Sequence, residues 1–124
     1  MEITINSQSK KDYLLIETKA TIETPEDLLE QSQIVYGEIS KHDFKKVLVD
    51  ERETNLLNSL IPYFDLVKNY VEKFPPEIYD LKIATVVSEE NKEVAASWEA
   101  ICLSRNLNYH SFTSFQDAEK WLLS

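Results

Sequence analysis

Short apolar runs alternate with helical patterns along most of the chain. Ile3 and Ile5 alternate with polar residues, which is typical of a half-buried strand. Polar residues 6–11 then predict a turn into a second strand that begins at Tyr13, and this short connection predicts an antiparallel hairpin. Three further strands are expected at 47–49, 81–87 and 109–112. The first two of these are apolar on both faces, as in a sheet that helices cover on both sides.

Helix signals lie between these strands. Thr24 and Pro25 predict a helix that starts with a threonine cap and a proline in its first turn, and ends near His42. Apolar residues at the helical interval predict a second helix over 59–74, which the prolines that follow it terminate. The last two helices are expected to follow caps at Ser88 and at Thr113 or Ser114.

The predicted order of elements is ββαβαβαβα. Strands that alternate with helices pair in parallel through right-handed crossovers, whereas the N-terminal strand of the hairpin is antiparallel. The length of 124 residues is that of one ordinary domain. The sequence therefore predicts a single α/β domain over residues 1–124, with a five-stranded, mainly parallel mixed sheet covered by helices.

Charge and composition narrow the partners and the compartment. The net charge of -9 disfavours general binding to nucleic acid or to anionic membrane surfaces. No apolar run reaches the roughly 18 residues that a membrane-spanning helix needs, and the N-terminus does not resemble a secretion signal. The single cysteine, Cys102, excludes an internal disulfide. We therefore expect a cytoplasmic protein.

The residues that most cofactor and metal sites require are sparse. The only glycine, Gly37, excludes the glycine-rich loops that cradle phosphates. His42 and His110 have no partners at metal-ligand spacing, so both are expected at the surface. Cys102 follows Trp98 on an apolar helical stripe, which predicts a buried, unreactive thiol. We expect no cofactor, no metal and no catalytic residue.

A charged break follows the third predicted strand. Asp50, Glu51 and Arg52 stand where an open parallel sheet binds ligands, outside the carboxyl ends of its strands. Ser88 and Glu89 follow the next strand and should share this rim. Adjacent residues of a strand point to opposite faces, which argues against Asp50 and Glu51 as an acid–base pair. The alternative interpretation is a solvated turn that contains a local ion pair.

Three stretches carry a family resemblance: "KKVLVDERE", "YFDLVKNYV" and "SWEAICLSRNLNYHSFTSFQDAEKWL". With the order of elements, they resemble the STAS / SpoIIAA-like group, and in particular its bacterial SpoIIAA-like branch. Members of that branch tend to end in W-E-x-x-x-x-N-R-G, then F, then A-x-x-W-L. The matching residues here are Trp98-Glu99, 104–107, Phe112, Ala118 and Trp121-Leu122, without the glycine. The resemblance implies a βα superhelix with an extra N-terminal strand.

The resemblance also implies a function. Anti-sigma-factor antagonists of the wider family carry a phosphorylatable serine in a D-S-S-G-like turn. Ser59 is the nearest match here, without an aspartate before it or a glycine after it. We therefore expect a non-enzymatic regulatory or protein-interaction module that binds a protein partner. Its expected working surface consists of Asp50, Glu51, Arg52, Ser59, Ser88 and Glu89.

An alternative follows from the similarity of this branch to lipid-carrier domains of the CRAL-TRIO type. It implies a carrier or sensor of a small apolar ligand, in a pocket lined by Tyr63, Phe64, Tyr70 and Trp98, although core packing explains these aromatic residues equally well. The sequence is consistent with a monomer or with a homodimer, since an exposed first strand can pair with another edge.

Overall fold

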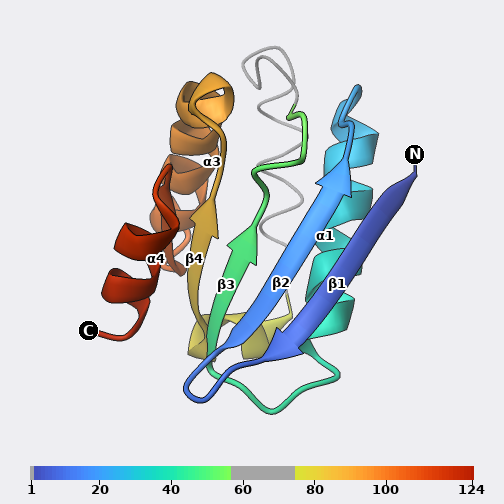
Figure 1. Ribbon diagram of the computed structural model, residues 1–124. Helices are drawn as coiled ribbons and strands as arrows, with labels where there is room; N and C mark the ends of the chain where they lie inside the picture. The colour runs from blue at the N-terminus through green and yellow to red at the C-terminus, as the bar shows by residue number, and fades with distance from the viewer. Residues whose placement is uncertain (1, 57–74) are drawn as a thin grey trace.

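The computed structural model describes residues 2–56 and 75–124. They form one five-stranded sheet in which the strands lie in the order of the sequence (Figure 1). β1 is antiparallel to β2, and the other neighbouring strands are parallel. This arrangement confirms the predicted fold class. The strands are β1 (Ile3–Ser9), β2 (Leu14–Ala20), β3 (Lys46–Asp50), β4 (Lys82–Val86) and β5 (Asn108–Phe112).

Helices cover both faces of this sheet. The described helices are α1 (Pro25–Ile39), α3 (Lys92–Ser104) and α4 (Phe115–Leu122), with short 3-10 helices η2 (Pro76–Asp80) and η3 (Glu89–Asn91). α1 and α3 lie on one face and α4 lies on the other (Figure 1). The helix predicted over 59–74 falls outside the described residues. None of the helices that the structure describes is long and apolar enough to cross a membrane.

Two apolar layers explain why the central strands are apolar on both faces. Alternate residues of each strand point to opposite faces of the sheet. Those on one face, such as Ile16 and Val49, pack toward α1 and α3. Those on the opposite face, such as Leu48, pack toward Ala118 and Leu122 of α4. Each fully buried aliphatic side chain of this kind contributes roughly 1.5–3 kcal/mol to folding.

Two of the predicted helix caps are present. The Thr24 hydroxyl accepts a hydrogen bond from the Asp27 backbone N–H at 3.1 Å, and Pro25 is the first residue of α1. The Ser114 hydroxyl accepts one from the Asp117 N–H at 3.2 Å. These bonds satisfy backbone donors that have no partner within the helix.

The predicted side-chain cap at Ser88 is wrong. Ser88 precedes the short turn η3, and α3 begins only at Lys92, with Asn91 in the capping position. The Ser88 hydroxyl makes no capping bond and instead accepts a hydrogen bond from Asn91 Nδ2 at 3.1 Å. The side chain of Asn91 thus takes the hydroxyl that would otherwise cap the helix.

β1 is longer than its apolar residues predict, and the predicted turn over 6–11 is correspondingly shorter. The strand pairs with β2 without interruption from Ile3–Ala20 to Ser9–Leu14. Lys10 N–H then donates to the Tyr13 carbonyl at 2.9 Å to close the hairpin. Polar side chains do not end a strand at the border of a sheet, because the side chains of Asn6 and Gln8 face solvent and that of Ser7 donates to Glu38 of α1, while the backbone continues to pair.

The C-terminus of α3 ends in a left-handed residue. Asn106 has φ 66°, and the Leu107 N–H donates back to the Cys102 carbonyl at 3.1 Å. This six-to-one bond is that of a Schellman motif, in which glycine is most common and asparagine is tolerated. Asparagine thus meets the backbone requirement of this turn without the glycine that the resembling family has nearby.

One backbone donor on the outer edge of β5 is taken by a side chain from α3. A carboxylate oxygen of Glu99 accepts a hydrogen bond from the Ser111 backbone N–H at 2.5 Å. The same oxygen lies 2.5 Å from Nδ1 of His110. The Ser111 N–H is therefore not free to pair with another strand.

Gly37 lies on the exposed side of α1, and no described atom lies within 4 Å of a Cβ built on it. Gly37→Ala is expected to raise the free energy of unfolding by about 1 kcal/mol, because alanine has less backbone entropy to lose in a helix. Urea denaturation measures this change. Gln33→Ala, at another exposed position of α1, is the control and should change stability by only a few tenths of a kcal/mol. A loss of stability in Gly37→Ala would contradict the expectation.

Candidate functional site

The described residues of the predicted partner-binding surface lie at the carboxyl ends of β3 and β4. We call them the carboxyl rim: Asp50, Glu51, Arg52, Ser88 and Glu89. The Glu51 N–H donates to the Val86 carbonyl at 2.7 Å, so the ends of the two strands lie side by side as the topology predicted. Ser59 lies outside the described residues.

Asp50 holds Arg52 in a fixed position. The Arg52 Nε and Nη2 atoms donate to the two carboxylate oxygens of Asp50 at 2.9 and 2.7 Å, and the Arg52 backbone N–H adds a third bond at 3.2 Å. The guanidinium also lies over the Phe115 ring, 5.5 Å from its centroid. The hydrogen bond to Asp50 raises the pKa of Arg52 further. This is the local ion pair of the alternative interpretation, and it leaves 49% of the arginine side chain exposed.

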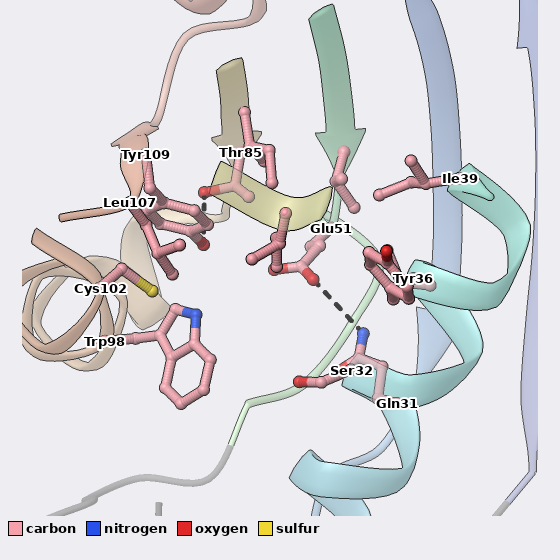
Figure 2. Close-up of a pocket in the computed structure, with 14 residues that line it drawn as sticks. Gln31, Ser32, Tyr36, Ile39, Glu51, Thr85, Trp98, Cys102, Leu107 and Tyr109 are labelled. Atoms are coloured by element: carbon pink, nitrogen blue, oxygen red, sulfur yellow. Dashed lines mark hydrogen bonds between the residues drawn. The ribbon is translucent and has the colours of Figure 1, made fainter. Parts of the chain in front are cut away.

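Glu51 points to the other face of the sheet, between α1 and α3 (Figure 2). The divergence of Asp50 and Glu51 agrees with the strand alternation, so the two carboxylates do not act as a pair. Gln31 is buried and its Nε2 lies 3.4 Å from Glu51 Oε1, a long hydrogen bond. Burial, and then the charge of Asp50, raise the pKa of Glu51 from 4.5 to about 7. Glu51 is therefore a group that exchanges a proton near neutral pH.

A polar network holds the loop after β3, and we call it the rim network: the buried Thr18, Thr54 and Asn91, with the half-buried Ser88. Asn91 Nδ2 donates to the Thr54 carbonyl and to the Ser88 hydroxyl, both at 3.1 Å. The hydroxyls of Thr54 and Thr18 are 2.7 Å apart. The network joins segments from β2, from the end of β3 and from the turn before α3. The sequence pointed only to Ser88 of these residues, because the burial of Thr18, Thr54 and Asn91 depends on contacts between segments that are distant in the chain.

Trp98 lines a small cavity between α1 and α3. The cavity has a volume of about 90 Å³ and also contacts Glu51, Cys102 and Tyr109 (Figure 2). The Tyr109 hydroxyl is 3.1 Å from Thr85 Oγ1, and burial raises its pKa well above 10. Pockets for drug-sized ligands measure roughly 300–1,000 Å³. The described cavity therefore gives the lipid-carrier alternative no support, and its other predicted residues, Tyr63, Phe64 and Tyr70, lie outside the described residues.

Cys102 and the histidines have structural surroundings. Cys102 is buried, as predicted, and burial followed by the charge of Glu99 raises the pKa of its thiol to about 12, which disfavours the reactive thiolate. His110 is partly exposed beside Glu99, and His42 Nε2 lies 3.8 Å from Glu38 Oε1. Within residues 2–56 and 75–124, no three His, Cys, Asp or Glu side chains are grouped as a metal site requires.

The sheet order and the helix arrangement define a SpoIIAA-like fold, and comparison with solved structures agrees. The chain is similar to an anti-sigma factor antagonist from Mycobacterium paratuberculosis, with a TM-score of 0.64 and 10% sequence identity over 99% of this chain and 96% of that one. It is also similar to an uncharacterized protein of the DUF3478 family with a SpoIIAA-like fold from Shewanella loihica. That match has a TM-score of 0.54 and 20% identity, over 97% and 93% of the two chains.

No family model and no curated protein matches the sequence. At these identities the likeness to solved structures establishes the fold. The fold implied by the STAS / SpoIIAA-like resemblance is thus confirmed.

Proposed function

We propose that this chain is a non-enzymatic regulatory module that binds a protein partner through the carboxyl rim. The observation that carries the proposal is the fixed but exposed guanidinium of Arg52. Asp50 and Phe115 hold it in place, while 49% of the side chain remains exposed. A charged group that is already ordered loses little side-chain entropy when it binds, and arginine is well suited to recognise a carboxylate.

The arrangement favours recognition over catalysis. Asp50 is occupied by Arg52, and Glu51 points to the opposite face, so the two carboxylates cannot act on one substrate together. Glu89 is exposed after β4 and offers an anion on the same rim. The rim thus presents a cation and an anion from neighbouring strands, which suits a polar protein surface of complementary charge. A structurally similar protein is described as an anti-sigma factor antagonist, which supports a regulatory role for this chain.

Arg52→Ala tests the proposal directly. The partner is first captured from the source cells with the immobilised full chain, and its affinity for purified variants is then measured by calorimetry. Arg52→Ala is expected to weaken binding at least about tenfold, because it removes a preorganised contact. The free energy of unfolding should fall by no more than about 1 kcal/mol, since the ion pair is partly exposed.

Lys41→Ala is the matched control. Lys41 also forms an ion pair within the chain, with Glu38 at 3.2 Å, but it follows the C-terminus of α1 at the opposite end of the sheet. Its replacement should leave partner binding unchanged. Equal affinities of the wild type and Arg52→Ala would contradict the proposed role of the carboxyl rim.

A further inference from the structure

The outer edge of β1 lacks the features that usually keep edge strands from pairing. Natural sheets protect such edges with charged side chains, prolines or bulges. β1 reads ITINSQS, without a charge or a proline, and its register with β2 contains no bulge. The nearest charged residues of the segment, Glu2 and Lys10, lie outside the strand at its two ends. β1 is the last strand of the sheet on its side (Figure 1).

The register identifies the backbone groups that this edge presents. The bond from the Lys10 N–H to the Tyr13 carbonyl makes these two residues a hydrogen-bonded pair of the hairpin. Hydrogen-bonded and non-hydrogen-bonded pairs alternate along antiparallel strands. The inward-bonding residues of β1 are therefore Thr4, Asn6 and Gln8. The N–H and C=O groups that point away from β2 belong to Ile3, Ile5, Ser7 and Ser9.

We propose that this edge binds a second copy of the chain, with β1 antiparallel to β1 about a two-fold axis at Asn6. In this register Ile5 lies opposite Ser7 of the second copy, and Ile3 lies opposite Ser9. All of these residues have outward backbone groups, so the strands can form a regular antiparallel ladder. The pairing joins two five-stranded sheets into one continuous sheet.

The charges that flank β1 argue for a second copy as the occupant. The same register places Glu2 opposite Lys10 of the second copy, and the two-fold axis repeats this pair at the other end of the ladder. Thr4 then lies opposite Gln8, and Asn6 lies opposite itself, so no like charges are opposed in the ladder. The net charge of -9 opposes self-association over most of the surface, which makes this uncharged strand the favourable place for two copies to meet.

Sedimentation equilibrium of the full chain, and of variants in which the charges at Glu2 and Lys10 are exchanged, tests the proposal. The wild type should form a reversible dimer. Glu2→Lys alone, or Lys10→Glu alone, opposes like charges at both ends of the ladder and should raise the dissociation constant on the order of tenfold. The double variant Glu2→Lys/Lys10→Glu restores opposite charges and should return the dissociation constant to within about threefold of the wild type.

Asn6→Lys provides a second test that preserves the monomer. Asn6 is exposed and lies opposite Glu17 of β2, so the new ammonium group has an acid as its neighbour within the chain. Across the two-fold axis it faces its own copy, and the dissociation constant should rise at least tenfold. In the wild type, hydrogen exchange at the amides of Ile5 and Ser7 should slow as the protein concentration rises. A monomer at every concentration up to the millimolar range, or a dimer that none of these variants weakens, would overturn the proposal.

Discussion

Asn91→Ala is expected to lower the free energy of unfolding by about 2–3 kcal/mol. The side chain is buried and supplies two hydrogen bonds, one to the Thr54 carbonyl and one to the Ser88 hydroxyl. Each bond contributes about 1 kcal/mol, and a buried carbonyl left without a donor adds a desolvation penalty of about 1 kcal/mol or more. Chemical denaturation at constant pH measures the change.

Asn55→Ala is the matched control for this prediction. Asn55 belongs to the same loop, but its side chain is exposed. Its bonds to Ala20 and Ile22 use the backbone, which alanine retains. The control should change stability by less than about 0.5 kcal/mol. If both variants lost stability equally, the rim network would not have the role assigned to it.

Glu51→Gln is expected to stabilise the protein at high pH and to leave it unchanged at low pH. The folded state raises the pKa of Glu51 from 4.5 to about 7, so it holds this proton more tightly than the unfolded chain does. The resulting stability is fully present below about pH 4.5 and is lost as pH rises through about 7. Glutamine avoids this loss because it stays neutral. Partial solvation of the half-buried carboxylate limits the expected gain above pH 7 to about 1–2 kcal/mol.

Denaturation of the wild type and of Glu51→Gln at a series of pH values gives the comparison. The two stability curves should coincide below about pH 4.5 and separate up to about pH 8, with the variant above the wild type. Glu53→Gln removes an exposed carboxylate two residues away and should not separate from the wild type in this way. Curves of Glu51→Gln and the wild type that stay parallel over the whole range would contradict the predicted proton uptake.

The sequence predicted those parts of the fold that local pattern determines. Alternation and apolar runs identified the strands, and Thr24 with Pro25 placed the start of α1 because a cap bond spans only three residues. The end of β1 was missed because its polar residues are held by pairing with β2, which the apolar pattern does not encode. The cap at Ser88 was missed because Asn91 competes for the same hydroxyl.

The candidate site was predicted in position but not in detail. The topology rule located the carboxyl rim, and strand alternation separated Asp50 from Glu51. The rim network could not be predicted, because Asn91 and Thr54 are 37 residues apart and meet only after the sheet has formed. The raised pKa of Glu51 likewise depends on the burial that α1 and α3 impose on the carboxylate.

The Glu99 carboxylate accepts a hydrogen bond from the Ser111 N–H at the outer edge of β5. The two edge strands of the sheet, β1 and β5, therefore differ in the backbone groups that they leave unpaired. Growth into a fibre requires that each subunit has two unpaired edge strands, so that every added copy exposes an edge to which the next copy can bind. Glu99 already takes one backbone donor at the outer edge of β5, so this edge offers a second subunit fewer free groups than the edge at β1 does. Removal of the Glu99 carboxylate, for example by Glu99→Ala, is therefore expected to make extended ribbons of concentrated protein more favourable.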